Sequence, residues 1–430
     1  MKQYSTIGKS IPRTDAPLQV TGNLVYGEDV YRPNMLIAKA KYSERMHAKI
    51  TRIDTSVAEK MPGVRAVITH KDIPFNRNGS GIYGILDQPV LADEKVYYRG
   101  DAIAVVAAET REQAEAAADA VIVEYEPLPA AFTVEEALAP GAPIIHPECG
   151  DSNISHHLII RDGDTSEHMF DDCDFIAEHT YHTQKVDHAP IEPHVGLAEV
   201  DPDGHLIITT STSRPFNYLG VMTSIMQMPA NMIRIRSENV GGAFGGKNEI
   251  TFEPWIAVLA QKTRRPVKMV YTREEDLNTS TIRHAYDLTY KTGIRKDGKL
   301  MANEVTIYAN SGAYLGLGKS TMLKATVHVC GPYYCRNVKV DSYLVYTNAL
   351  IGSSMRGMGV PQVCFALESQ LDILAEMAGI SPADIRRMNM FDHLGLLPNG
   401  QAVSGGPMKA AFERAWEIFN DPTRWKGAVK

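Results

Sequence analysis

The stretch NVGGAFGGKN (residues 239–248) decides how the chain is interpreted, because it places four glycines and a lysine between two regular elements. Before it, MIRIRS (232–237) alternates apolar and polar side chains, which predicts a half-buried strand. After it, EITFEPWIAVLAQK (249–262) predicts a helix. Three explanations fit such a turn: a phosphate-binding P-loop, a glycine bulge without a ligand, or a loop whose backbone N–H groups approach a ligand closely.

The P-loop explanation rests on the spacing Gly241-x4-Gly246-Lys247. A P-loop continues with Ser or Thr, whose hydroxyl binds Mg²⁺, whereas this chain has Asn248. We find no convincing acidic Mg²⁺ partner on a hydrophobic strand elsewhere. Nucleotide binding is therefore a minor alternative.

Composition narrows the class of protein. The chain has 430 residues, 44% of them hydrophobic and 22% charged, which predicts a globular protein of two to four domains. A net charge of −7 without a basic tract argues against nucleic acid and anionic membranes as partners. The N-terminus has no apolar signal region, and no run of 18 apolar residues occurs, so we expect neither secretion nor membrane insertion.

Cysteine usage favours a cytoplasmic location. The five cysteines are odd in number and form no C-x-x-C pair. A disulfide framework, a zinc site and an iron–sulfur cluster carried by this chain are all disfavoured. We expect buried thiols.

The chain divides into four parts by pattern. Residues 1–19 predict an irregular lead-in, and residues 20–130 alternate short strands and helices as a small α/β domain does. The Pro- and Ala-rich segment 131–173 predicts a linker. Residues 174–430 form a larger region that carries the glycine loop. Within these parts, the clearest elements are strands at 64–69, 101–108 and 206–212, and helices at 109–120 and 362–378.

A second glycine-bearing stretch, SMRGMGVPQ (354–362), also precedes a predicted helix. Two helix N-termini would offer unpaired N–H groups to an anion. Arg356 adds a forked cation suited to phosphate. The alternative is that Arg356 only bonds to backbone carbonyls.

Together, VGGAFGGK and MRGMGVPQ resemble the two glycine signatures of the large subunit of molybdenum hydroxylases, the xanthine dehydrogenase and aldehyde oxidase family. The resemblance extends over residues 5–420 and includes VTGNLVYGED (20–29), YRGDAIAVVAAET (98–110), IEPH (191–194) and SPADIRRMN (381–389). It implies an α+β fold, with an N-terminal α/β hammerhead domain followed by the first molybdenum-cofactor-binding domain.

The resemblance also implies a cofactor site. The loop Gly242, Ala243, Phe244 and Gly245 would lie against a molybdenum–pyranopterin cofactor, in bacterial relatives the cytosine dinucleotide form. Phe244 and Arg356 would lie near the molybdenum. Ser213 stands where the family commonly has a cofactor-contacting glutamine, which puts that contact in doubt.

Three positions bear on the substrate. Asn248 replaces a purine-binding glutamate of xanthine-oxidising members. The aromatic side chain that stacks on the purine in those members has no clear match, and the second loop offers Met358 instead. Lys324 maps to a substrate-orienting arginine. It either pairs with a carboxylate substrate such as nicotinate or is a surface lysine.

Family large subunits usually continue with a second cofactor domain that carries the catalytic glutamate. We therefore expect no catalytic residue in this chain, and Glu192 is interpreted as structural. The chain is expected to be one half of a split subunit, as in nicotinate dehydrogenases, or an incomplete chain. Its partners would be a second molybdopterin subunit, a [2Fe–2S] subunit and a FAD subunit.

The expected activity is hydroxylation of an electron-poor carbon of a nicotinate-like or purine-like N-heterocycle, or of an aldehyde, with water as oxygen source. One alternative is a non-catalytic subunit that shapes the cofactor cavity. Another is a metal site of His188, Glu192 and His194, which two intervening prolines make improbable.

Overall fold

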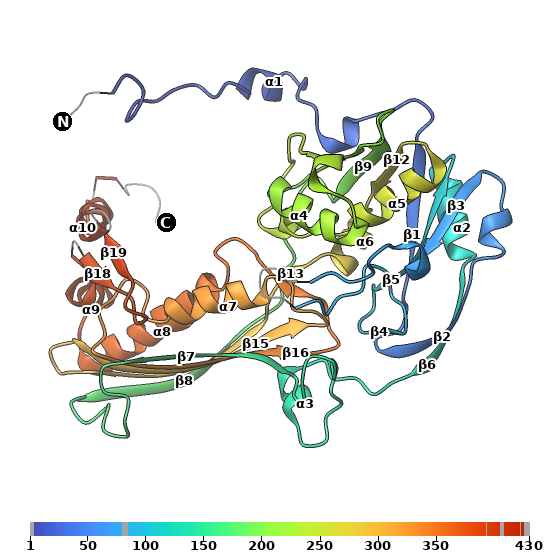
Figure 1. Ribbon diagram of the computed structural model, residues 1–430. Coiled ribbons are helices and arrows are strands. Elements are labelled where there is room, and N and C mark those ends of the chain that lie inside the picture. The colour runs from blue at the N-terminus through green and yellow to red at the C-terminus, as the bar shows by residue number, and fades with distance from the viewer. Residues whose placement is uncertain (1–3, 80–84, 393, 405–407, 422, 425–430) are drawn as a thin grey trace.

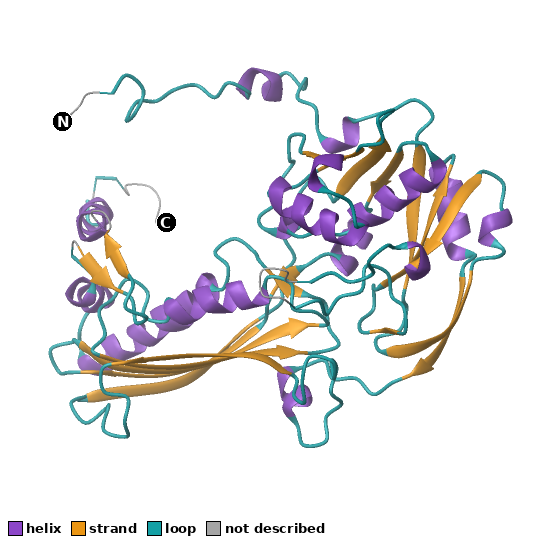
Figure 2. Ribbon diagram, in the orientation of Figure 1, coloured by secondary structure: helices purple, strands orange, loops and turns teal. Residues whose placement is uncertain are grey.

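The computed structural model describes residues 4–79, 85–392, 394–404, 408–421 and 423–424. Two lobes lie side by side in Figure 1, one built on a mixed sheet under short helices and the other on a long sheet covered by α7 and α8. Both lobes pack helices against a sheet (Figure 2), and antiparallel strand pairs outnumber parallel ones in each of the two sheets, which confirms the predicted α+β class.

The first lobe is organised by a seven-stranded sheet with the order β11-β10-β9-β12-β1-β5-β3. Leu36 of β1 pairs in parallel with Val267 of β12, so residues of the predicted first domain and of the cofactor region share one sheet. The predicted boundary near residue 130 therefore does not separate two sheets. The strands are β1 (Leu36–Tyr42), β3 (Val64–Thr69), β5 (Ala102–Ala108), β9 (Val195–Val200), β10 (Leu206–Thr210), β11 (Ile233–Arg236) and β12 (Val267–Val270).

Burial explains why this sheet forms. All seven residues of β5 are buried, as its continuous apolar run predicts. Helix α2 (Arg111–Asp119) follows, with Thr110 as N-cap accepting from the backbone N–H of Gln113. A smaller sheet of β2 (Ala48–Asp54), β4 (Lys95–Val96) and β6 (Ile122–Pro127) adjoins it.

The second lobe is a five-stranded sheet with the order β7-β16-β15-β14-β8. Its strands are β7 (Ile154–Asp162), β8 (Phe175–Thr183), β14 (Tyr286–Ile294), β15 (Leu300–Gly312) and β16 (Asn337–Tyr346). Helices α7 (Gly318–Val327) and α8 (Val360–Ala378) cover one face (Figure 1). The core of this lobe includes Tyr290, Leu344 and Leu371.

The segment 131–173 is therefore more than the predicted linker, because it contains α3 (Val134–Leu138) and the edge strand β7. The composition of residues 127–143 indicated a loop, and β7 has a single buried residue, so its sequence lacks the apolar run of a central strand. Pairing with β16 along residues 154–162 makes it a strand.

The helix predicted at 249–262 begins later, at Glu253. A 3-10 turn, η6 (Gly246–Asn248), follows the glycine loop, and α5 (Glu253–Thr263) starts after Phe252. The glycine loop thus does not open a helix N-terminus, which was part of the anion-binding argument. The second loop does, since Gly359 is the N-cap of α8.

The remaining elements, which include the 12-residue helix α4, lie between the strands or near the chain ends. They are α1 (Ala16–Val20), η1 (Gly27–Asp29), η2 (Ala58–Lys60), η3 (His70–Asp72), α4 (Pro215–Met226), η5 (Ala230–Met232), α6 (Arg273–Thr279), β13 (Ile282–Arg283), β17 (Gly352–Ser353), α9 (Pro382–Asn389), β18 (Leu394–Leu396), β19 (Ala402–Ser404) and α10 (Met408–Phe419).

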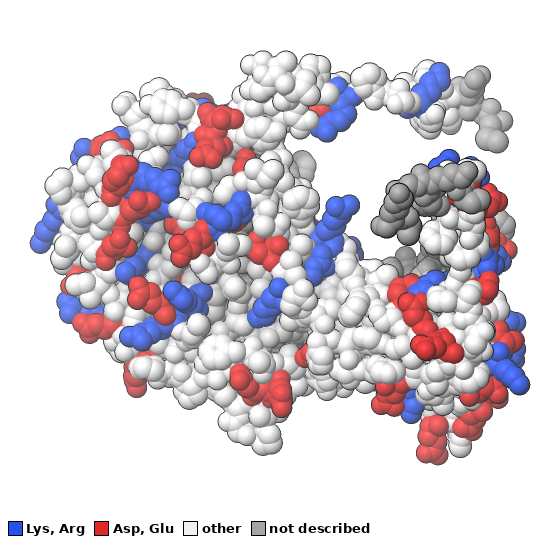
Figure 3. All heavy atoms as spheres, turned by 180° about the vertical axis from the view of Figure 1, so that it is seen from behind, with Lys and Arg blue, Asp and Glu red and all other residues white. Residues whose placement is uncertain are grey.

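Two sequence expectations concern the surface. Acidic and basic side chains are interspersed over the face shown in Figure 3, so no broad basic surface covers that face. Within the described ranges, no helix is long and apolar enough to span a bilayer.

The expectation of buried thiols is wrong for Cys149 and Cys364, which are exposed, and right for Cys330 and Cys335.

Candidate functional site

The glycine loop owes its shape to backbone conformations that few side chains tolerate. Gly242 and Gly245 have φ of +103° and +107°, which L-residues rarely adopt. Phe244 between them also lies in the left-handed region, with φ of +52°, and the residue is 49% exposed. An exposed aromatic residue on a strained backbone indicates a surface built for a contact.

The second loop packs directly against the first. The Arg356 N–H donates to the carbonyl of Phe244 at 2.8 Å, and the Ser354 hydroxyl donates to the carbonyl of Gly245 at 3.1 Å. A Cβ atom on Gly245 would lie 2.7 Å from the Ser354 carbonyl oxygen, so only glycine allows this approach. The structure thus joins the two sequence motifs into one surface.

This surface borders an open hollow of about 510 Å³, lined by His188, Phe244, Arg283, Met355, Arg356, Gly357 and Pro361. Arg283 supports the wall, since its guanidinium donates to the Arg356 carbonyl at 2.7 Å and to the Gln362 side chain at 3.1 Å. The Arg356 guanidinium is exposed, and within the described part of the chain no side chain or carbonyl bonds to it. A free forked cation beside a hollow suits an anionic ligand.

Lys247 is not available to a phosphate. Its side chain is fully buried and its Nζ lies 2.6 Å from Oε2 of Glu192. Glu192 also accepts from the backbone N–H of Gly241 at 3.0 Å and of Gly27 at 3.3 Å. The P-loop alternative is therefore wrong, because the lysine fixes the loop from beneath. The structural interpretation of Glu192 agrees with these contacts.

The proposed metal alternative is also wrong. His188 bonds to the Ser354 carbonyl at 2.8 Å, and His194 bonds to the Asp276 carboxylate at 2.5 Å. Glu192 is paired with Lys247, so the side chains of His188, Glu192 and His194 each contact a different partner. Among the residues described, the groups with metal-ligand spacing lie elsewhere in the chain.

The other predicted site residues surround the loops without lining the hollow. The Asn248 amide donates to the Ser354 hydroxyl at 3.0 Å, so it bridges the two loops. The Lys324 Nζ lies 3.4 Å from the Met358 sulfur, which brings those two predicted substrate residues together. Ser213 is exposed, and its N–H donates to the Lys247 carbonyl at 3.1 Å. Their roles toward a ligand stay predictions.

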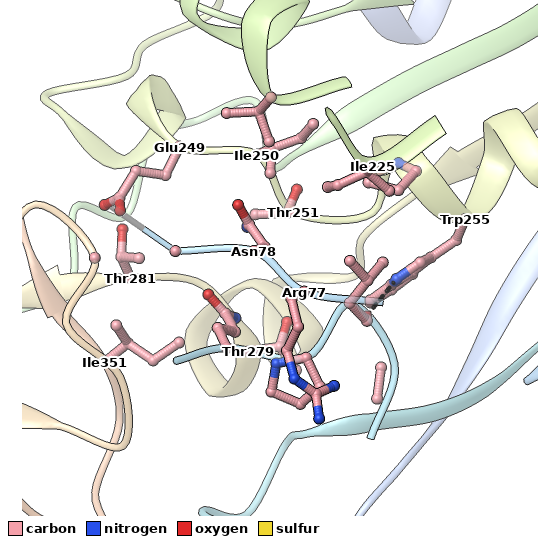
Figure 4. A pocket seen from close by; sticks show the side chains of 18 of the residues that line it. Arg77, Asn78, Ile225, Glu249, Ile250, Thr251, Trp255, Thr279, Thr281 and Ile351 are labelled. Carbon is pink, nitrogen blue, oxygen red and sulfur yellow. Dashed lines mark hydrogen bonds between the residues drawn. The ribbon is translucent and has the colours of Figure 1, made fainter. Parts of the chain in front are cut away.

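A second space, which the sequence did not indicate, lies behind the glycine loop. It is a cavity of about 470 Å³ between the first lobe's sheet, α4 and the segment leading into α5. Figure 4 shows the carboxyl of Glu249 and the hydroxyl of Thr281 on the same side of it, with Trp255 across from them. In the sequence, the only possible sign of this cavity was Glu249, the acidic residue directly after Asn248. No sequence pattern distinguishes it from a surface glutamate.

The comparisons with known proteins agree with this geometry. Residues 145–390 match the molybdopterin cofactor-binding domain, and residues 21–129 match the a/b hammerhead domain of aldehyde oxidase and xanthine dehydrogenase. The chain belongs to the xanthine dehydrogenase and aldehyde oxidase family of molybdenum oxidoreductases.

Two family members illustrate the range of sequence relatives. The large molybdopterin subunit of nicotinate dehydrogenase from Eubacterium barkeri is 38% identical over 423 residues, covering 97% of this chain and 98% of that protein. The aldehyde oxidoreductase of Megalodesulfovibrio gigas is 33% identical over 407 residues, covering 92% of this chain and 44% of that protein. The chain thus spans nearly all of the first relative and less than half of the second.

Solved structures in the family match the whole chain. Aldehyde oxidoreductase from Desulfovibrio desulfuricans superposes with a TM-score of 0.92 at 29% identity, covering 97% of this chain and 47% of that one. Quinoline 2-oxidoreductase from Pseudomonas putida 86 gives a TM-score of 0.90 at 26% identity, covering 99% and 56%. Both confirm the fold of a hammerhead domain followed by a cofactor-binding domain.

The residues present fit the family's cofactor. Gly242 and Gly245 leave the loop backbone uncovered at two positions, and Phe244 and Arg356 line the adjoining hollow. An anionic, sulfur- and phosphate-bearing group would find both backbone and a guanidinium there. The open side of the hollow leaves room for a large ligand or a covering chain.

Glu249 gives this family member a testable pH dependence. Burial raises the pKa of the Glu249 carboxyl to about 7, although the Ser353 hydroxyl bound to it acts in the opposite direction. An unfolded glutamate titrates at about 4.3, so the folded chain loses stability relative to the unfolded chain as pH rises between these values.

We therefore expect Glu249→Gln to stabilise the protein relative to the wild type by an amount that grows by about 1–3 kcal/mol between pH 4 and pH 8 and levels off above. Denaturant unfolding at each pH measures the difference. A difference independent of pH would contradict the raised pKa.

Proposed function

We propose that this chain is the molybdopterin-binding subunit of a multi-subunit molybdenum hydroxylase. It would act on an electron-poor carbon of an N-heterocycle, nicotinate-like or purine-like, with water as the source of oxygen. The observation that carries the proposal is the docking of the two glycine loops, which presents Phe244 and the free guanidinium of Arg356 at one hollow.

The cofactor, when bound, supplies the oxygen insertion and accepts two electrons from the substrate. The chain itself would position the cofactor and place a positive charge beside it. The backbone of Gly242, Ala243 and Gly245 would contact the cofactor, and Phe244 and Arg356 would lie nearest the metal. We propose the cytosine dinucleotide form of the pterin.

The same proposal assigns the partners. A base that removes the proton of the attacking water is expected on a second molybdopterin subunit, which would cover the open hollow. A [2Fe–2S] subunit and a FAD subunit would carry electrons away, since this chain has no C-x-x-C pair to hold a cluster. The name of the E. barkeri relative, a large molybdopterin subunit, supports the proposal of a second molybdopterin subunit.

Asn248, Lys324 and Met358 are proposed to contribute to the substrate side of the site. The contact between Lys324 of α7 and Met358 holds Lys324 against the second loop, in which Met358 lies two residues after Arg356. Ser213, in the connection between β10 and α4, is proposed to face the cofactor with a shorter reach than a glutamine.

Labelled water tests the proposal. The complex, purified from its source with its companions, is incubated with N-heterocycles in H₂¹⁸O and an artificial electron acceptor. We expect one ¹⁸O atom per molecule of product. Product oxygen that comes from O₂ instead of water would refute a molybdenum hydroxylase.

One observation favours a second candidate. Ser213 in place of the glutamine removes a contact, as expected for a subunit that shapes the cofactor cavity without turnover. In that case the complex would contain molybdenum but oxidise no heterocycle, and Ser213→Gln would not create activity.

A further inference from the structure

The cavity behind the glycine loop has the construction of a small-molecule site. Its volume of about 470 Å³ lies within the range of about 300–1,000 Å³ that ligand pockets occupy. Its walls are largely apolar, with Trp255 and Tyr98 among the aromatic side chains and Ile250 and Ile351 among the aliphatic ones. Such walls suit a flat, uncharged ring.

The cavity and the cofactor hollow are joined through two neighbouring serines. The Ser353 hydroxyl donates to Oε2 of Glu249 in the cavity. Ser354, the next residue, donates to the carbonyl of Gly245 in the glycine loop and accepts from Asn248. A ring bound beside Glu249 therefore lies close to the loops proposed to hold the cofactor, because Glu249 directly follows Asn248 and Ser353 directly precedes Ser354.

Two buried hydroxyls of the cavity, those of Tyr42 and Thr281, lack a hydrogen-bond partner within the described ranges. The Thr281 side-chain hydroxyl is buried, with the residue 8% exposed, and within the described ranges nothing accepts from it or donates to it. A buried hydroxyl without a hydrogen bond costs free energy, which a ligand that bonds to it would recover. Figure 4 places the Thr281 hydroxyl beside the Glu249 carboxyl.

The charges around Glu249 disfavour an anion. Arg77 is the one Lys or Arg among the described lining residues, and its guanidinium bonds to the Asp93 carboxylate at 2.5 Å. Asp101, also in the lining, accepts from the Tyr314 hydroxyl at 3.0 Å. Outside the cavity, the charged groups that act on Glu249 are Arg214 and Asp87, which oppose one another.

We propose that this cavity binds the substrate as an uncharged N-heterocycle with an N–H donor, and that the Glu249 carboxyl selects it over heteroaromatic carboxylates. The inference rests on the proposed function and narrows its substrate class. A carboxyl accepts from a ring or amide N–H, whereas a second carboxylate in the same cavity meets a like charge with no free cation. The substrate would thus differ from the one in the name of the E. barkeri relative.

Nicotinamide and nicotinate form a matched pair for the test, because they share a ring and differ in charge. We expect the assembled, cofactor-loaded complex at pH 7.5 to bind nicotinamide at least about tenfold more tightly than nicotinate in calorimetric titrations. Glu249→Gln should bring the ratio of dissociation constants to within about threefold by improving nicotinate binding. The control Glu178→Gln, an exposed carboxyl on β8, should leave the ratio unchanged.

A second variant protects the test against misfolding. Thr281→Val should weaken nicotinamide binding without lowering the melting temperature, since the hydroxyl has no partner to lose. Three results would overturn the inference: nicotinate binding as tight as nicotinamide binding, an unchanged ratio in folded Glu249→Gln, or no binding of either compound. If the ratio holds but no heterocycle is oxidised, the proposed function fails and the selectivity of the cavity stands.

Discussion

Replacing Lys247 with alanine is expected to lower the free energy of unfolding by about 3–5 kcal/mol. The ammonium group is fully buried and lies 2.6 Å from the Glu192 carboxylate. Without the ammonium group, the mostly buried Glu192 carboxylate has no cationic partner. The hydrogen bonds that it accepts from the N–H groups of Gly27 and Gly241 do not replace that positive charge. Denaturant unfolding followed by tryptophan fluorescence measures the change.

A lysine on the surface provides the matched control. Lys291 is partly exposed, and its nearest carboxylate, on Glu178, lies 3.9 Å away. The Lys291 ammonium also lies 4.9 Å from the centre of the Phe170 ring, so Lys291→Ala should lower the free energy of unfolding by less than about 1.5 kcal/mol. Equal effects of the two substitutions would contradict the assignment of Lys247 as an internal support. So would a Lys247→Ala protein of normal stability that has lost binding of a nucleoside triphosphate.

Gly245→Ala is expected to reduce the molybdenum content of the assembled complex by about tenfold or more. The new Cβ would lie 2.7 Å from the Ser354 carbonyl oxygen and 3.1 Å from the Met355 Cα, which forces the two loops apart. The hollow lined by Phe244 and Arg356 depends on their contact. Elemental analysis of the purified variant gives the ratio of metal to chain.

Gly379→Ala separates the effect of the clash from the effect of the backbone conformation. Gly379 also has a positive φ, +67°, but a Cβ there meets no atom within 4 Å. Both substitutions strain the backbone, by about 1 kcal/mol or more, and only Gly245→Ala separates the loops. Full molybdenum content in Gly245→Ala, or an equal loss in Gly379→Ala, would contradict the assignment of the glycine loop to the cofactor.

Local pattern predicted the elements whose signals are contained in a few residues. The strand predicted at 101–108 and the helices predicted at 109–120 and 362–378 correspond to β5, α2 and α8 with small differences at their ends. Edge strand β7 was missed because its stability comes from pairing with β16, almost 180 residues away, and not from its own composition.

The candidate site divides in the same way. The two glycine motifs and Arg356 could be named from the sequence through the family resemblance, and the structure brings them together. The direction of Lys247 could not, because the motif gives its spacing while burial against Glu192 decides its partner. Glu249 could not be distinguished either, since its role depends on a cavity whose walls come from many separate segments.

Molybdenum per chain, measured on the complex purified without oxygen and with its companions attached, tests the central claim most directly. The account predicts about one molybdenum atom and one pterin per copy of this chain, together with further polypeptides that carry iron and flavin. An intact complex that contains this chain but no molybdenum would contradict it.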